Sequence, residues 1–386
     1  MIYLDNAATS FPKPEPVFRA MDAFARSSAA NPGRSGHRRA VEAEAMINET
    51  RLLLSRLFGF SRPERLVFTL NATDALNMAI KGVLRPGDHA ITSVLEHNSI
   101  SRPLNQLERD GVITLTRLPA DGNHRIDPRE VVKVFKPSTR LVALTHVSNV
   151  TGTIQDIGAI GPAVRERDAF FLVDASQSAG AVPIRFEKDC LDLLAFTGHK
   201  ALLGPTGTGG LVVGERVEVS PWREGGTGGD SSSPVQPSEL PHRLEGGTPN
   251  VFGLSGLREG IRLLLDRGVE NVLAHERSLV AEFYRALRDP GLFSWYGADN
   301  VISERKGEGR VGLVGLNLPG LAPAELAAIL DERFDIAVRS GLHCAPYAHK
   351  HLGTFPEGLV RFSVGFLTTM EDVRQAASAL DEIALG

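Results

Sequence analysis

The central part of the chain alternates short apolar runs with stretches of helical periodicity. Seven apolar runs between residues 66 and 214 predict strands, and the segments between them have the length of crossover helices. This alternation is typical of a mostly parallel α/β sheet with helices on both faces. The predicted strands are 66–70, 89–95, 112–118, 140–147, 170–174, 193–197 and 209–213, and the predicted helices are 73–83, 98–110, 128–135 and 157–167.

The flanking regions show other patterns. Apolar residues at spacings of three, four and seven predict one long amphipathic helix over 37–59, which Gly59 ends. Residues 221–250 are rich in Gly, Ser and Pro and predict an extended loop region, and loops of that length tend to be functional. Residues 255–288 have a helical composition. Beyond them the pattern predicts strands at 311–318 and 335–339 and helices at 323–333 and 369–384.

A chain of 386 residues is longer than the size at which one hydrophobic core stops growing, about 250–300 residues. We therefore expect two domains. The large one would cover 15–256, and a smaller C-terminal α+β domain would cover 257–386, with segment 1–14 packed nearby.

Composition and charge exclude several classes of protein. The net charge is −4, so there is no electrostatic signature of a nucleic-acid partner. The longest apolar runs, such as 141–144, are far too short to span a membrane. The segment Met1–Asn6 lacks the basic and apolar regions of a signal peptide. We therefore expect a cytoplasmic protein with no membrane partner.

The chain has only two cysteines, Cys190 and Cys344, and no Cys-x-x-Cys. This argues against a disulfide framework and against a thiolate zinc site. At least one thiol is therefore available for chemistry.

The predicted strand 193–197 leads directly into Gly198, His199 and Lys200. A lysine at the end of a buried strand is costly unless it is neutralised or used, and a Schiff base with an aldehyde cofactor does both. Two other interpretations of Lys200 stay open at this point. In one it is a surface lysine. In the other it belongs to a phosphate-binding loop, although no Gly-x-x-x-x-Gly-Lys-Ser/Thr is present.

A second apolar strand, 170–174, ends in the carboxylate of Asp174. Pyridoxal enzymes need an acid that keeps the ring nitrogen protonated, so that the ring accepts electrons. Capping of the next helix is the alternative role for such an aspartate. The nearby Lys200 segment favours the cofactor role.

Two further turns are predicted at the same edge of the sheet. Residues 68–75 form a strand and a small-residue turn that opens a helix, where backbone N–H groups and the Thr73 hydroxyl can bind an anion. His97 follows another strand and can stack on a cofactor ring and relay protons. Taken singly, each is weak, because Thr is a common helix cap and a lone His is usually structural.

Seven short segments in order carry a more specific signal: Tyr3–Thr9, Glu96–Ser99, His146–Gly152, Asp174–Gln177, Thr197–Lys200, Gly247–Asn250 and Arg339–Ala345. With them the chain resembles the class V aminotransferase family, in particular its group II, Suf-type cysteine desulfurases and selenocysteine lyases. The resemblance covers residues 3 to 361. It implies fold type I of the pyridoxal-phosphate enzymes (aspartate aminotransferase-like), a homodimer, and conversion of L-cysteine or L-selenocysteine to L-alanine for a sulfur-acceptor protein.

The resemblance also implies roles for individual residues. Lys200 would hold pyridoxal 5′-phosphate, Asp174 would bind its ring nitrogen, Gln177 its phenolic oxygen and His97 its ring face. The phosphate would be bound by Thr73, Thr197 and His199, and by Thr248 of the second subunit, and Ala72 would also contact the cofactor.

The resemblance also implies which residues bind the substrate. Asn149, which also contacts the cofactor, and Arg361 would bind the substrate carboxylate, with Arg339 and His37 near the pocket mouth. Cys344 would accept the sulfur as a persulfide, a step that transamination does not need.

Some features depart from the family pattern. Leu342-His343 and His97-Asn98 stand where pairs of histidines are usual, which suggests a less-studied branch and leaves substrate and acceptor open. A buried inert Cys344 and another class V activity are alternatives. A metal site of His343, Cys344, His349 and His351 is a further one, although we expect no metal. The last alternative is that the chain has no cofactor and serves as a scaffold that binds a sulfur-carrier protein.

Overall fold

The computed structural model describes residues 1–33, 35–227, 232–297 and 309–385. In these ranges the largest sheet has seven strands in the order β2-β8-β7-β6-β5-β3-β4. β8 is antiparallel to both neighbours, and all other pairs are parallel, which confirms the predicted fold. The strands are β2 (Leu66–Thr69), β3 (His89–Ser93), β4 (Thr114–Leu118), β5 (Thr139–Thr145), β6 (Phe170–Asp174), β7 (Leu193–Thr197) and β8 (Gly209–Val213).

The continuous apolar sequence of the strands reflects burial on both faces. In β6, Phe171 and Val173 belong to the hydrophobic core on one side of the sheet, and Phe170 and Leu172 to the core on the other. Successive side chains of a strand point to opposite faces, so each apolar residue has a core to enter. The crossover helices are α3 (Ala72–Val83), α4 (Asn98–Arg109), α5 (Pro128–Lys133) and α6 (Ile157–Arg165).

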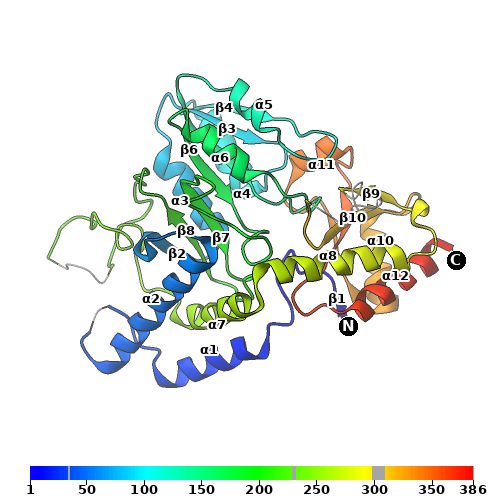
Figure 1. Ribbon diagram of the computed structural model, residues 1–386, viewed down its shortest axis with the longest axis horizontal. Coiled ribbons are helices and arrows are strands. Elements are labelled where there is room, and N and C mark those ends of the chain that lie inside the picture. The colour runs from blue at the N-terminus through cyan, green and yellow to red at the C-terminus, as the bar shows by residue number, and fades with distance from the viewer. Residues whose placement is uncertain (34, 228–231, 298–308, 386) are drawn as a thin grey trace.

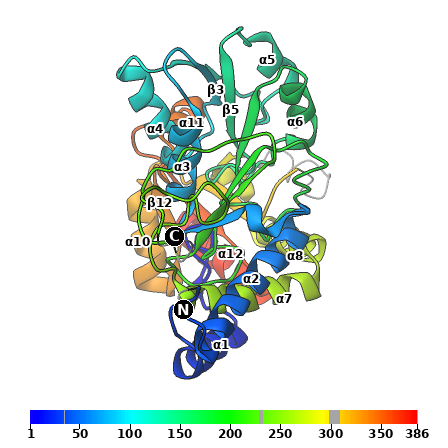
Figure 2. The same ribbon diagram turned by 90° about the vertical axis from the view of Figure 1, so that its left-hand side faces the viewer.

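Three helices gather at one end of the molecule, as both views show (Figures 1 and 2). They are α1 (Glu15–Ser27), α2 (Arg38–Phe58) and α7 (Val251–Arg267), and α7 contacts both of the others. The long helix predicted before the sheet is confirmed by α2, which ends at Gly59 in the left-handed conformation, with φ of 69°. The sequence pattern did not predict α1.

The helical composition of residues 255–288 is confirmed, and the structure divides this region into two helices. The chain forms α7 and then α8 (Val269–Ala286), separated by Gly268 at a φ of 81° that a residue with a side chain rarely adopts. Figure 1 shows α8 extending from the end of α7 toward the C-terminal elements, where both ends of the chain lie.

The C-terminal part is built on a four-stranded antiparallel sheet in the order β12-β13-β10-β9. The predicted strand 335–339 is wrong as one element, because β11 pairs with β1 in a separate parallel ribbon while β12 joins the larger sheet. The remaining elements are β1 (Ile2–Tyr3), β9 (Ser294–Tyr296), β10 (Leu313–Asn317), α10 (Pro323–Phe334), β11 (Ile336–Ala337), β12 (Arg339–Gly341), α11 (Pro346–Leu352), β13 (Leu359–Ser363), α12 (Met370–Leu385) and the short 3₁₀ turns η1 (Pro63–Arg65) and η2 (Pro290–Leu292).

The boundary expected between residues 256 and 257 falls inside α7. Leu257 and Leu264 of that helix belong to the same core as Phe171. We propose a division at Gly268 instead, because α8 contributes Leu279 and Phe283 to the C-terminal core.

Residues 228–231 of the predicted loop region 221–250 lie outside the described residues. No helix in the described part of the chain is both long enough and apolar enough to cross a membrane.

Candidate active site

The carboxyl ends of the parallel strands open onto a cavity of about 220 Å³. This is the edge of an α/β sheet where ligands bind. The structure brings together at this cavity the following residues singled out from the sequence: Ala72, Thr73, His97, Asn149, Asp174, Gln177, Thr197, His199, Lys200, Arg339 and Arg361.

Lys200 follows β7 by three residues and lines this cavity. Burial lowers the pKa of its amine to about 8, an effect that the negative charge of Asp174 opposes and the positive charge of Arg361 strengthens. A larger fraction of this amine is therefore neutral near pH 7 than in an ordinary lysine. A neutral amine is the form that attacks an aldehyde.

Asp174 is the last residue of β6 and is only 3% exposed. Its Oδ1 accepts a hydrogen bond from the Ser176 backbone N–H at 2.9 Å and another from the Ser176 hydroxyl. These bonds fix the carboxylate at the cavity wall, and Lys200 lies in the wall of the same cavity.

His97 caps α4 and is held by Ser99, a residue to which the sequence pattern assigned no role. The Nδ1 atom of His97 accepts from the Ser99 backbone N–H at 3.1 Å, so the proton of the neutral ring sits on Nε2. The Ser99 hydroxyl lies 2.9 Å from this Nδ1 and 2.8 Å from the Thr73 hydroxyl. Burial lowers the pKa of His97 to about 4, opposed by Asp174 and strengthened by Lys200.

Another part of the cavity wall suits an anion. It opens at the first turn of α3, where Asn71 caps the helix by accepting from the Asp74 N–H at 3.0 Å. β8 passes this turn so closely that a Cβ on Gly209 would lie 2.7 Å from the Asn71 backbone. The buried Nδ1 of His199, at the same cavity, has no hydrogen-bond partner among the described residues. A phosphate group fits these donors.

Arg361 of β13 reaches the cavity from the C-terminal part and is 1% exposed. Its Nη2 contacts the Asp5 carboxylate at 2.7 Å, and its Nη1 donates to the Asn149 carbonyl at 2.9 Å. Its buried Nε has no partner in the part of the chain that the structure describes. Asp5 lies in the Tyr3–Thr9 segment, but sequence reasoning gave it no role.

Cys344 is exposed and lies beside the cavity, next to His343, which lines it. The Arg339 guanidinium Nη2 is 3.6 Å from the Cys344 Sγ. The Asn98 N–H donates to the Cys344 carbonyl at 2.7 Å, and the Asn149 side chain donates to the His343 carbonyl at the same distance. The thiol segment is thus anchored to the loops that line the cavity.

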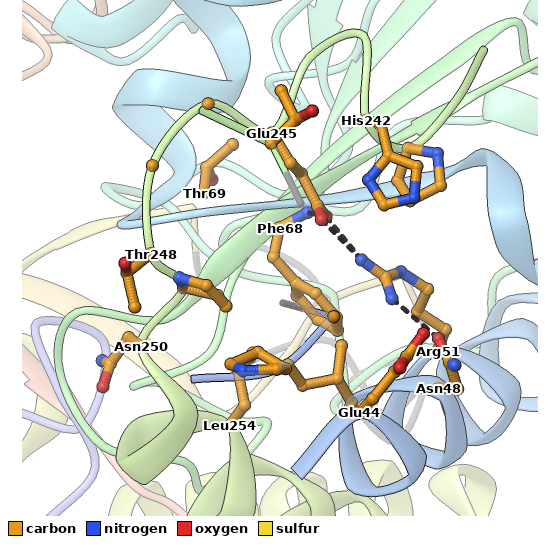
Figure 3. Close-up of a pocket in the computed structure, with 18 of the residues that line it drawn as sticks. Glu44, Asn48, Arg51, Phe68, Thr69, His242, Glu245, Thr248, Asn250 and Leu254 are labelled. Carbon is orange, nitrogen blue, oxygen red and sulfur yellow. Dashed lines mark hydrogen bonds and ion pairs between the residues drawn. The ribbon is translucent and has the colours of Figure 1, made fainter. Parts of the chain in front are cut away.

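Thr248 and His37 do not line this cavity. Thr248 is exposed and lines a second cavity, of about 470 Å³, whose wall also contains the ion pair between Arg51 and Glu245 (Figure 3). His37 is exposed and caps α2 by accepting from the Ala40 N–H at 3.3 Å.

The histidines proposed as metal ligands divide into two separate pairs. His343 contacts His349, whereas His351 contacts His124. No group of three or more metal-binding side chains converges among the residues that the structure describes.

A fold of this kind with a buried lysine and aspartate at the strand ends defines a pyridoxal-phosphate enzyme of fold type I. The family model Aminotransferase class-V matches residues 2–376, and the chain belongs to this family, which depends on pyridoxal phosphate. The predicted family and cofactor are confirmed. The unpaired His199 nitrogen and the anion-binding turn fit that cofactor's phosphate.

Several similar proteins within this family carry the name cysteine desulfurase. The chain is 34% identical to a probable cysteine desulfurase of Pyrococcus abyssi, covering 99% of this chain and 94% of that protein. It is 32% identical to the putative cysteine desulfurase IscS 1 of Bacillus subtilis, covering 99% and 98%. The apo structure of the cysteine desulfurase from Thermococcus onnurineus NA1 matches with a TM-score of 0.92 and 35% identity, over 100% of this chain and 95% of that chain. The cysteine desulfurase CsdA from Escherichia coli, in its S-sulfonic acid form, matches at 0.87 and 30%, over 100% and 94%.

Proposed function

We propose that the chain is a pyridoxal-phosphate-dependent cysteine desulfurase that converts L-cysteine to L-alanine and receives the sulfur on Cys344. The observation that carries this is the pairing of a buried amine, Lys200, with an exposed thiol beside the same cavity. An aminotransferase needs the amine but has no use for the thiol. The names of the relatives support the same activity.

The cofactor, when bound, supplies an electron sink for the negative charge that develops at the substrate Cα. Asp174 would hold the protonated ring nitrogen of the cofactor. Lys200 would anchor the cofactor through its amine, and the free amine would act as the base that moves the proton at the substrate Cα. The neutral ring of His97 lies in the cavity wall, where it can cover the ring face.

Arg361 and Asn149 hold the substrate carboxylate in this proposal. A guanidinium binds a carboxylate through two parallel hydrogen bonds, a geometry that a lysine cannot reproduce. The Asp5 contact orients Arg361 before substrate arrives.

Sulfur transfer uses Cys344 as the nucleophile. Its thiolate attacks the substrate sulfur, an S–S bond forms, and the substrate Cβ–S bond breaks. The electron pair of that bond stays on the substrate, which takes up a proton and leaves as alanine. Arg339 places positive charge at 3.6 Å from Sγ, the kind of environment in which reactive cysteines occur. The exposure of Cys344 lets a sulfur-acceptor protein reach the persulfide.

The proposal includes a homodimer in which Thr248 contacts the phosphate held by the other subunit. It is supported by the exposure of Thr248 and by its absence from the cavity of its own chain. His37 would likewise approach the partner's pocket mouth. A cytoplasmic location is part of the proposal, because both cysteines are free thiols.

The test is to incubate the purified holoenzyme with L-cysteine and to quantify alanine and protein-bound sulfane sulfur together. We expect alanine to form and the bound sulfur to map to the Cys344 peptide. Cys344→Ser should lose both products while it keeps the yellow cofactor, and Cys190→Ser should behave as the wild type.

Two results would redirect the assignment. Alanine production that survives in Cys344→Ser would contradict a role of this thiol as sulfur acceptor. Turnover that requires a 2-oxo acid would identify an aminotransferase, and a strong preference for L-selenocysteine would identify a lyase.

A further inference from the structure

A row of buried polar side chains lies behind the Cys344 segment. The imidazole rings of His343 and His349 lie edge to edge, with centroids 5.6 Å apart and planes 22° apart. They are 2% and 0% exposed, and Thr354 beside them is also buried. The His343 Nε2 lies 3.1 Å from the Arg339 carbonyl oxygen, its Nδ1 lies 3.4 Å from the His349 Nε2, and the His349 Nδ1 lies 2.8 Å from the Thr354 hydroxyl.

The carbonyl at one end fixes the direction of every bond in this row. The Arg339 carbonyl only accepts, so the Nε2 of His343 carries a proton and its Nδ1 accepts. The Nε2 of His349 can then donate to it, which leaves the Nδ1 of His349 as an acceptor of the Thr354 hydroxyl; the Leu342 backbone also bonds this ring. Both rings are neutral in this arrangement. Burial supports this, because it lowers the pKa of His343 to about 2 and that of His349 to about 4.

The row connects elements that meet at the thiol. It joins the backbone of Arg339 in β12 to α11, which contains His349, through the residue that precedes Cys344. His343 and Cys344 both have left-handed backbone, with φ of 49° and 58°. Residues with a side chain adopt that conformation uncommonly, and two in succession indicate that the surroundings hold the segment in place.

We propose that His349 is a positioning residue for sulfur transfer, which through His343 keeps the Arg339 guanidinium and the Cys344 thiol together. This rests on the proposed function, in which Cys344 receives the sulfur. Hydrophobic residues of similar volume would fill the same space without the cost of burying two imidazoles, so packing alone does not account for the pair. The described contacts do not bring His349 to the cavity itself.

A matched pair of variants separates positioning from packing. His349→Asn keeps an acceptor near the Nδ1 position for Thr354 but has no donor for His343. His349→Gln places an amide N–H near the Nε2 position and restores that donor. Both are compared with the wild type in a Cys190→Ser background.

The main readout is the rate at which iodoacetamide alkylates Cys344, followed by peptide mass mapping across pH. We expect His349→Asn to react about tenfold more slowly near neutral pH, the factor that corresponds to the net contribution of one hydrogen bond. Its pH profile should move to higher pH, and kcat with L-cysteine should fall about as much while KM stays within about twofold. His349→Gln should stay within about threefold of the wild type.

A second pair covers the case in which the His349 variants do not fold. Thr354→Val removes the hydroxyl that holds the His349 Nδ1, and Thr354→Ser keeps it. We expect only the valine variant to slow alkylation and shift the pH profile.

The outcomes are distinct. Equal alkylation rates and pH profiles across the folded variants, with changes in the unfolding temperature alone, would reduce His349 to a packing residue. A wild-type enzyme that makes no alanine from L-cysteine would instead refute the proposed function, and the alkylation rates would still decide whether His349 positions the thiol.

Discussion

The two reactive side chains of this protein lie in opposite surroundings. Lys200 follows a central strand, inside a cavity where burial lowers its pKa to about 8. Cys344 is exposed, in a left-handed segment between a short strand and a short helix. An amine must be neutral to attack an aldehyde, and burial favours the neutral form, whereas a thiol that passes sulfur to a second protein must be accessible. In the proposed function, this difference corresponds to a division of labour between an enclosed cofactor site and an open sulfur-transfer site.

The substitution Lys200→Ala should have the largest effect on the enclosed site. We expect alanine formation to fall by about 10⁴-fold, because the variant loses both the covalent anchor and the group that moves the Cα proton. The purified protein should also lose the yellow colour of the bound cofactor. Alanine release and the absorbance spectrum are the measurements.

The matching change on the open side is Cys344→Ala. It should abolish sulfur transfer but retain the colour, since the thiol takes no part in holding the cofactor. Equal loss of colour in both variants would contradict the division of labour.

Asp174→Asn should have the next largest effect. An amide does not hold the ring nitrogen protonated, so we expect kcat to fall by about 10²- to 10³-fold while the protein still takes up cofactor. Ser176→Ala, which removes only the hydroxyl donor to this carboxylate, should fall by less than about tenfold. Steady-state kinetics of the two variants would contradict the assigned role if their losses were alike.

The substitution Arg361→Lys tests the binding of the substrate carboxylate, at a residue of the C-terminal part that reaches the cavity of the large sheet. The change keeps the charge but loses the two-point geometry, so KM for L-cysteine should rise about tenfold with a smaller change in kcat. Arg374→Lys, on an exposed part of α12, serves as the control. A kcat loss with unchanged KM would show that Arg361 does not bind the substrate carboxylate in the ground state.

The smallest expected effect concerns Glu276, which is buried and lines a small cavity shared with Lys200. Burial raises the pKa of its carboxyl from 4.5 to about 7, while its bond from the Gly312 N–H opposes the rise. The folded state therefore binds more protons than the unfolded state between these values, so stability falls as pH rises through this window.

Glu276→Gln removes that titration and keeps a carbonyl for the Gly312 N–H. We expect the variant to be more stable than the wild type by about 1 kcal/mol above the window, near about pH 8, with a smaller difference near about pH 5. Denaturant unfolding at both pH values measures this. Glu332→Gln, at an exposed position of α10, should show no such pH-dependent gain.

The sequence predicted the surroundings of Lys200 better than those of Cys344. The strand leading to Lys200 is apolar from Leu193 to Phe196 because both faces of the sheet are buried, and that pattern is visible without a structure. The β11–β12 break is not visible, because two short strands with one residue between them look like a single run.

Contacts between distant segments were also beyond the sequence pattern. The Arg361–Asp5 pair joins residues at opposite ends of the chain, and the contact between His343 and His349 depends on how α11 returns toward β12. Ser99 gave no signal because its role arises from two neighbours, Thr73 and His97, that only the fold brings together. Residues that act on other residues are less visible in a sequence than residues that perform the chemistry.

The most direct test of the account is borohydride reduction of the purified protein followed by peptide mass mapping. We expect one reduced pyridoxyl adduct, located on Lys200 within its peptide. An adduct on another lysine, or a cofactor-saturated protein without any adduct, would contradict it.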